Sequence, residues 1–529
     1  MRLTPGLPSP ERRDFYLFRL TFLGLLLFET ASFLVFLTPR LGTPSFLVAA
    51  AALTLLTLWR FDWAITVLFI ELCVGSQGGY LLSLPVAGLQ FSLRMLLFTL
   101  VVGVWAARSV ITLFTRRGSG MEWFRQLRES RLLWPLAVLY AVFALAFLNG
   151  WLQGHSVSDV FFDGNGYVYY AAVPALLAGL TDPTVRRRTV IALAAALSWS
   201  LTKALVVLFV FSHRLMVIAP DMYVWVRDTR VGEITRMVGD FYRIFFQSHV
   251  FALPLLFAAF TYLLAVADWR SRTSRAALAV FLVAATAVIM GFSRSFWFGI
   301  AVAGLALVAW AAWSGLFTGL WRRTAVLAAA ALFTAVAVVG AVYAFPFPAR
   351  TGDVSLAALL GGRALSLSED AAATSRWSLL PKMMAAIGRH PFIGSGFGAT
   401  VTYKTSDPRI LALIPSGEYS TYAFEWGWHD LWLKLGLLGL AALLWFLWSA
   451  IRPAFEILVD ARRQDAAVKE KAAMAAAILS GFSALLATNV FSPYLNHPLG
   501  IGIIVLLASF AGAIRNQRPS PSRDPMNSR

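Results

Sequence analysis

The sequence predicts an all-α polytopic membrane protein with about fourteen transmembrane helices. Composition is the first reason, because 59% of the 529 residues are hydrophobic and only 14% are charged. The second reason is that the apolar residues form long uninterrupted blocks, whereas a soluble helical protein shows an amphipathic period of about 3.6 residues. The third reason is block length, since a helix needs about 20 residues to cross a hydrocarbon core about 30 Å thick.

The apolar blocks define the predicted spans. They cover approximately residues 15–38, 44–59, 62–78, 92–114, 132–149, 166–181, 190–211, 246–266, 277–292, 296–318, 324–345, 426–449, 473–491 and 498–514. Arg12 and Arg13 precede the first block as in a signal sequence, but no small-residue cleavage site follows it. We therefore expect an uncleaved first span.

Basic residues predict the orientation of the chain. Arginines gather in four loops, at 115–131, 183–189, 267–276 and 319–323. Alternation of the spans puts all four loops on one side of the membrane together with both termini, and the positive-inside rule identifies that side as the cytoplasm. The same rule, with anionic lipid, accounts for the formal net charge of +18. We therefore expect no nucleic-acid partner.

The opposite face carries the two longest connections, at about 212–245 and about 346–425. The second is too aromatic and too apolar for a disordered segment, so chemistry is expected there. Its apolar residues at helical spacing are Trp377, Leu380, Met384 and Ile387. This spacing predicts an amphipathic helix that either lies on the membrane surface or covers the loop's own core.

The chain therefore divides into four parts. They are a bundle of about eleven spans at 1–345, the outer loop at 346–425, about three further spans at 426–514, and a disordered cytoplasmic tail at 515–529. The single cysteine, Cys73, lies inside an apolar block. Disulfides and cysteine-based metal sites are thereby excluded.

Three arginines form the first candidate site. Arg243 precedes the eighth span, Arg294 lies between the ninth and tenth, and Arg376 belongs to the amphipathic helix. A guanidinium at membrane depth costs at least about 2.5 kcal/mol unless it reaches water or a partner. A single arginine near a helix end often only snorkels to lipid headgroups. Three on one face indicate an anionic ligand, and the planar fork of donors suits phosphate.

The motif FEWGWHDLWLKLG opens the twelfth span and holds the candidate general bases. Glu425 and His429 lie one helical turn apart on one face, and Trp432 continues that stripe. A partly buried carboxylate or imidazole is the kind of group that general-base catalysis uses. A Glu–His pair that only caps the helix and hydrates its entrance is the alternative.

Further candidate sugar or loop contacts are Asp430, Trp426, Trp428 and His390. The tryptophans also fit an interfacial aromatic belt. The glycine-rich segment 388–400 either lets backbone amides approach a phosphate or turns the chain back to the membrane. The sequence has no P-loop, Gly-x-Ser-x-Gly or His-Glu-x-x-His motif and no aspartate cluster for a divalent ion, so neither cofactor nor metal is expected.

Taken in order, these motifs resemble the O-antigen ligase and O-antigen polymerase superfamily of bacterial polysaccharide assembly. The matching pieces are Arg243 before a mid-chain span, Ser293-Arg294 between two spans, Arg376-Trp377 leading into His390-Pro-x-x-Gly-x-Gly, and Gly-Leu-Leu-Gly at 436–439. The resemblance covers roughly residues 240–440. The order and spacing of the motifs carry it.

The resemblance implies a metal-independent, inverting glycosyltransferase with a C-type multi-spanning helical fold in the bacterial inner membrane. Its active site would be periplasmic, its donor a glycan on undecaprenyl diphosphate and its acceptor another glycan. Other polysaccharide assembly proteins would be its partners. By position, Arg243, Arg294 and Arg376 would bind the diphosphate, and a base in the periplasmic loop would activate the acceptor hydroxyl.

One departure from the family pattern favours the polymerase branch. Ligases place a histidine eleven residues before the first glycine of Gly-x-x-Gly, where this chain has Glu425, and His429 comes one turn later. An O-antigen ligase or a protein O-oligosaccharyltransferase is the alternative. A lipid-linked oligosaccharide flippase is less expected, because flippases generally keep short loops, a cationic cavity and internal repeats.

Overall fold

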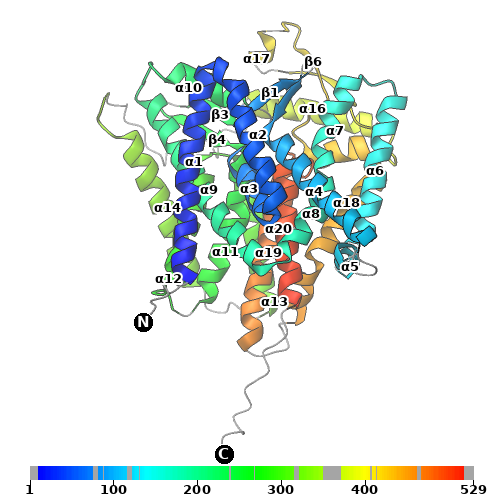
Figure 1. Cartoon of the computed structure of the whole chain (residues 1–529). Helices are drawn as coiled ribbons and strands as arrows, with labels where there is room; N and C mark the ends of the chain where they lie inside the picture. Colours follow the sequence, from blue (N-terminus) through cyan, green and yellow to red (C-terminus); the bar gives the residue numbers. More distant parts are fainter. Residues whose placement is uncertain are drawn as a thin grey trace, which may run out of the picture.

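The computed structural model describes residues 10–75, 81–86, 89–115, 122–129, 131–237, 240–266, 268–314, 321–348, 361, 371–405, 408–412, 414–460 and 466–516. This part of the chain is predominantly helical and contains three short antiparallel hairpins. Figure 1 shows the helices side by side in one bundle, with the hairpins towards one end.

Twelve helices of the described residues are long and apolar enough to cross a membrane, by length and composition. They are α1 (Pro10–Leu37), α2 (Gly42–Trp59), α4 (Leu93–Thr115), α6 (Leu133–Leu152), α9 (Pro183–Ser212), α11 (Ala252–Ala265) together with the 3₁₀ turn Gln247–Phe251 that leads into it, α12 (Arg272–Met290), α13 (Arg294–Ser314), α14 (Trp321–Tyr343), α18 (Gly427–Asp460), α19 (Ala466–Thr488) and α20 (Pro498–Asn516). Helices satisfy every backbone group internally, as hydrocarbon requires. The predicted multi-pass, all-α membrane protein is confirmed.

Two predicted spans coincide with shorter helices. The span 62–78 coincides with α3 (Phe61–Val74), whose 14 residues rise only about 21 Å, less than the hydrocarbon thickness. The span 166–181 begins in α7 (Val157–Val168) and continues through a 3₁₀ turn into α8 (Val173–Leu180). The count of about fourteen crossings therefore stays a prediction.

The two ends of the bundle differ in structure. Figure 1 shows the start of α1 and the end of α20 at one end, and α10 (Ala219–Asp228) with the hairpin of β3 (Gly232–Arg236) and β4 (Tyr242–Phe246) towards the other. We call the first the terminus end and the second the hairpin end. The hairpins β1 (Ser83–Val86)–β2 (Leu89–Ser92) and β5 (Val401–Lys404)–β6 (Glu418–Thr421) also belong to it. A short helix, α5 (Glu122–Glu129), lies at the terminus end.

The long connection before α18 forms its own small core. It contains α16 (Ala371–Ile387), β5, α17 (Pro408–Leu411) and β6, whereas residues 349–360 and 362–370 lie outside the described part. Leu379, Met383 and Ile387 of α16 are buried against this core, and Trp377 and Met384 of the expected stripe are exposed. These contacts favour the reading in which the helix covers the loop's own core.

Charged residues inside the bundle are paired. Lys203 of α9 donates to Glu29 of α1 at 2.9 Å, and Arg94 of α4 donates to Glu71 of α3 at 2.8 Å. All four side chains are buried. Because an unpaired charge in hydrocarbon is costly, each pair ties its two helices together.

Candidate functional site

Arg376 and Glu425 form an ion pair at the hairpin end of the bundle. The guanidinium of Arg376, on α16, contacts the carboxylate of Glu425, two residues before α18, and their side chains are 39% and 53% exposed. The indole N–H of Trp426 donates to the backbone carbonyl of Arg376 at 2.9 Å. The candidate phosphate-binding arginine and the candidate base are therefore direct neighbours.

His429 lies beside this pair on the first turn of α18. Its half-buried imidazole meets the ring of Trp426 edge to face, with 5.7 Å between the ring centroids. Trp428 has a different position, because its indole N–H donates to the Leu486 carbonyl of α19 at 3.2 Å. Trp428 therefore fastens α18 to α19. His390 is exposed in the turn that follows α16.

The turn after α19 links the start of α13 to this group. Arg294 begins α13 and is half-buried, and the next residue, Ser295, accepts a hydrogen bond from Ser492 at 3.0 Å. The neighbouring Phe491 packs its ring against Trp426 at 5.4 Å. Ser295 and Trp426, the residues that follow Arg294 and Glu425 in the chain, thus contact the same short turn.

Arg243 is held next to the turn that precedes Arg294. It lies on β4, and its Nε donates to the carbonyl of Gly291 at 2.9 Å. Its terminal nitrogen forms an ion pair with Glu233 of β3 at 3.2 Å, and its guanidinium lies 5.0 Å from the Phe245 ring centre. These contacts fix the guanidinium, so that it would bind an anion with little loss of conformational entropy.

The helix α18 is interrupted at Gly436, further along the chain from the Arg376–Glu425 pair. Gly436 has φ +68° and ψ −175°, which interrupts the helix. The N–H groups of Leu437 and Leu438 therefore lose their helical acceptors and donate to the carbonyls of Pro391, at 2.9 Å, and Phe392, at 3.1 Å. The segment that follows α16 thus replaces the missing helical bonds.

The same segment satisfies the carbonyl groups before the break. The N–H of Ser395 donates to the Leu433 carbonyl at 2.7 Å, and the N–H of Gly396 donates to the Lys434 carbonyl at 3.1 Å. We call residues 391–398 the glycine turn. It is docked into the membrane bundle at the interruption of α18.

Three glycines make this docking possible. Gly394, Gly396 and Gly398 have φ of +79°, +78° and +79°, a region that side chains rarely allow. The next amides also have protein acceptors, since Phe397 donates to Ala146 at 3.1 Å and Gly398 to Asp163 at 2.8 Å. The amides that a phosphate would need are occupied, which favours the reading of this segment as a turn that returns the chain to the membrane.

A buried charge cluster lies beneath the glycine turn. Lys434 of α18 forms ion pairs with Asp163 of α7 and, at 2.5 Å, with Asp430, and the three side chains are 1%, 5% and 1% exposed. Asn496 donates to Asp430 at 2.9 Å. Asp430, a candidate sugar or loop contact, is part of this cluster. Sequence reasoning missed Asp163, Lys434 and Asn496, although a lysine inside an apolar block was a usable signal.

Tyr422 adds a neutral hydroxyl near the same end. Burial, with the negative charges of Asp159 and Asp163, raises the pKa of its phenol. The site can thus offer guanidinium groups to an anion, and a carboxylate, an imidazole and a phenol to a hydroxyl. Among the described residues, His, Cys, Asp and Glu side chains form no group of three or more that could hold a metal ion.

When the chain is compared with protein-family models and with curated proteins, none of them matches it.

Proposed function

We propose that this protein polymerises lipid-linked oligosaccharide repeat units by glycosyl transfer from an undecaprenyl-diphosphate donor at the hairpin end. One observation carries the proposal: Arg376 pairs with Glu425, His429 lies against Trp426, and the turn after α19 contacts both Trp426 and Ser295, the residue that follows Arg294. Cations beside a carboxylate and an imidazole suit a reaction with a diphosphate leaving group and a hydroxyl nucleophile.

In the proposed reaction, Arg243 and Arg294 bind the two phosphates of the donor. Glu425, or His429 from the next turn, removes the proton of an acceptor hydroxyl, whose oxygen attacks the anomeric carbon of the donor glycan. The bond from that carbon to the phosphate oxygen breaks with inversion, and undecaprenyl diphosphate leaves. Guanidinium groups stabilise the negative charge that develops on it.

Arg376 has two successive roles in this scheme. Its ion pair with Glu425 orients the carboxylate before substrate binds. Both side chains are partly exposed, so an arriving diphosphate can compete for the guanidinium, because surface pairs of this kind are worth only about 1 kcal/mol. Release from Arg376 then frees Glu425 to act as the base.

The proposed setting is the bacterial inner membrane with the hairpin end in the periplasm. The arginine-rich loops belong to the end that holds both termini, which the positive-inside rule places in the cytoplasm. The lipid tail of the donor would enter from the bilayer, so that only its diphosphate and glycan reach the arginines.

Substitution of Arg294 by lysine tests the proposal. Arg294→Lys keeps the charge but loses the two-pronged donor geometry, and should abolish most glycan transfer without loss of protein from the membrane. Arg270→Lys, an exposed arginine at the terminus end, is the matched control. Near-normal transfer by Arg294→Lys would remove the diphosphate assignment.

Product analysis after deletion in the native host identifies the reaction. Loss of long chains while single repeats remain attached supports a polymerase. Loss of all attached glycan would mean a ligase or protein transferase, and accumulation of donor on the cytoplasmic face would mean a flippase. Chelation of divalent ions should leave transfer unchanged, and inhibition that Mg²⁺ reverses would contradict the scheme.

A further inference from the structure

A second candidate site lies at the terminus end of the bundle. A cavity of about 380 Å³ opens between the end of α2, the start of α3, α4, and the junction of α8 with α9. Arg188 in the same region pairs with Asp62, and the adjacent Arg187 pairs with Asp14 near the start of α1. The cavity is therefore on the opposite side of the membrane bundle from Arg376 and Glu425.

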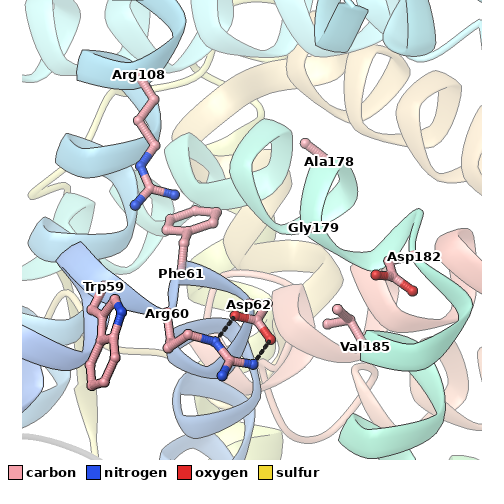
Figure 2. Close-up of a pocket in the computed structure, with 9 residues that line it drawn as sticks. All are labelled: Trp59, Arg60, Phe61, Asp62, Arg108, Ala178, Gly179, Asp182 and Val185. Atoms are coloured by element: carbon pink, nitrogen blue, oxygen red, sulfur yellow. Dashed lines mark hydrogen bonds and ion pairs between the residues drawn. The ribbon is translucent and has the colours of Figure 1, made fainter.

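Arg108 supplies a cation to this cavity. Its terminal nitrogen donates to the backbone carbonyl of Leu58 at 2.7 Å, and its guanidinium lies 5.3 Å from the centre of the Phe61 ring. Figure 2 shows Arg108 on one side of the cavity with the guanidinium beside Phe61, and Asp182 on the other side. Within the described residues, Arg108 forms no ion pair with a carboxylate, so its charge is available to a ligand.

The two carboxylates that line the cavity, Asp62 and Asp182, both have hydrogen-bond partners within the protein. Asp62 is bound by Arg60 at 3.2 Å and by Arg188 at 2.9 Å, as Figure 2 shows for the first of these pairs. Asp182 accepts the backbone N–H of Thr184 at 2.7 Å and thereby caps α9. Asp182 keeps its negative charge, but Arg60, Arg108 and Arg188 bring three positive charges against these two carboxylates. The excess of one positive charge favours an anionic group.

The surroundings of the cavity favour a lipid as the source of that anion. Only 11% of the most apolar stretch of α2, and 11% of that of α4, is buried inside the protein, so acyl chains must cover both helices. Trp59, at the end of α2, is 86% exposed at the mouth of the cavity. An exposed tryptophan at a helix end is typical of the headgroup layer.

We propose that this cavity binds the phosphodiester of a membrane phospholipid in the leaflet at the terminus end. Arg108 holds the phosphate through its remaining donors, Phe61 keeps the guanidinium in place, and the acyl chains lie along α2 and α4. A basic pocket between transmembrane helices fits a lipid headgroup in both charge and depth. The proposal is independent of the glycosyl transfer proposed above.

Native mass spectrometry of the full-length protein in detergent tests this site. Phosphatidylglycerol is titrated onto wild type, Arg108→Gln, and the control Arg40→Gln, which removes an exposed arginine from the α1–α2 connection at the other end. Arg108→Gln should weaken lipid binding about fivefold, and Arg40→Gln should leave it unchanged. Equal binding by wild type and Arg108→Gln would overturn the proposal.

A second variant and a competitor complete the test. Trp59→Ala changes an exposed side chain that the fold does not need, and should also weaken lipid binding. Unchanged binding by this variant would argue against the site. Inorganic phosphate at millimolar concentration should not displace the lipid. Displacement by phosphate, with equal loss in Arg108→Gln, would mean a soluble anion site and would overturn the lipid assignment.

Discussion

Replacement of Lys434 by methionine should be the most damaging single change in the described interior. Lys434 is 1% exposed and is the cation between Asp163 and Asp430. Without it, two buried carboxylates face each other, and only hydrogen bonds from Asn496 and the Gly398 amide remain. Removing one partner of a buried ion pair costs about 3–5 kcal/mol, so we expect a loss of that size in the free energy of unfolding.

The loss should come from the unpaired carboxylates, and a rescue variant isolates that cause. Asp163→Asn and Asp430→Asn in the Lys434→Met background remove both charges and keep acceptors for the Gly398 and Asn496 donors. We expect this triple variant to recover at least half of the lost stability. Replacement of a whole buried ion cluster by neutral groups is often close to neutral.

Reversible unfolding in mixed micelles gives the necessary free energies. Lys382→Met, at an exposed position on α16, is the control and should stay within about 0.5 kcal/mol of wild type. The reasoning is refuted if Lys434→Met lies within about 1 kcal/mol of wild type. It is also refuted if the triple variant is no more stable than the single one.

Three further predictions concern the hairpin end. Gly436→Ala should lower the free energy of unfolding by more than about 2 kcal/mol, because φ is +68° and a Cβ would clash with the Phe392 carbonyl. The control Gly340→Ala, in open space on α14, should be neutral or stabilising. Equal free energies of unfolding for the two variants would contradict this reasoning. A double-mutant cycle on Arg376→Gln and Glu425→Gln should give a coupling of about 0.2–1 kcal/mol that falls in high salt, and a zero coupling at low salt would refute the pair. Burial and nearby carboxylates raise the pKa of Tyr422, so its neutral form is favoured on folding. The contribution of Tyr422 to the free energy of unfolding should be constant below about pH 10, the ordinary phenol pKa, and should decrease at higher pH. Tyr422→Phe should therefore lose less stability than wild type above that pH. An equal loss of stability in both proteins at alkaline pH would contradict the prediction.

The transmembrane helices could be predicted because hydrocarbon imposes one length and one composition on each of them. The prediction was least accurate where that rule is relaxed. The helix α3 ends at Val74 after 14 residues, and the span 166–181 is interrupted between α7 and α8. An apolar run predicts the length of a segment but not the turns inside it. Such turns are tolerated because neighbouring helices can supply hydrogen-bond partners for the backbone N–H and C=O groups that a turn leaves unpaired.

The candidate site was only partly predictable, for a different reason. The spacing predicts Glu425 and His429 one helical turn apart, although α18 begins only at Gly427, and nothing local indicates that Arg376, 49 residues earlier, reaches the Glu425 carboxylate. Lys434 and Asp163 are 271 positions apart. A charged residue inside an apolar block indicates that it has a partner, but only the tertiary structure identifies that partner.

The break at Gly436 explains why the glycine turn is a poor phosphate site and a good anchor. In hydrocarbon, each unsatisfied backbone group costs several kcal/mol, so the groups released by the break must find partners. Leu437 and Leu438 find them in the turn, which in return uses the Leu433 and Lys434 carbonyls for its own amides. The turn therefore cannot leave to bind substrate without exposing both sets of groups. Under the proposed function, anion recognition at this end would then fall to arginine side chains, and any movement on substrate binding would come from α16 and the β5–β6 hairpin, outside the docked turn.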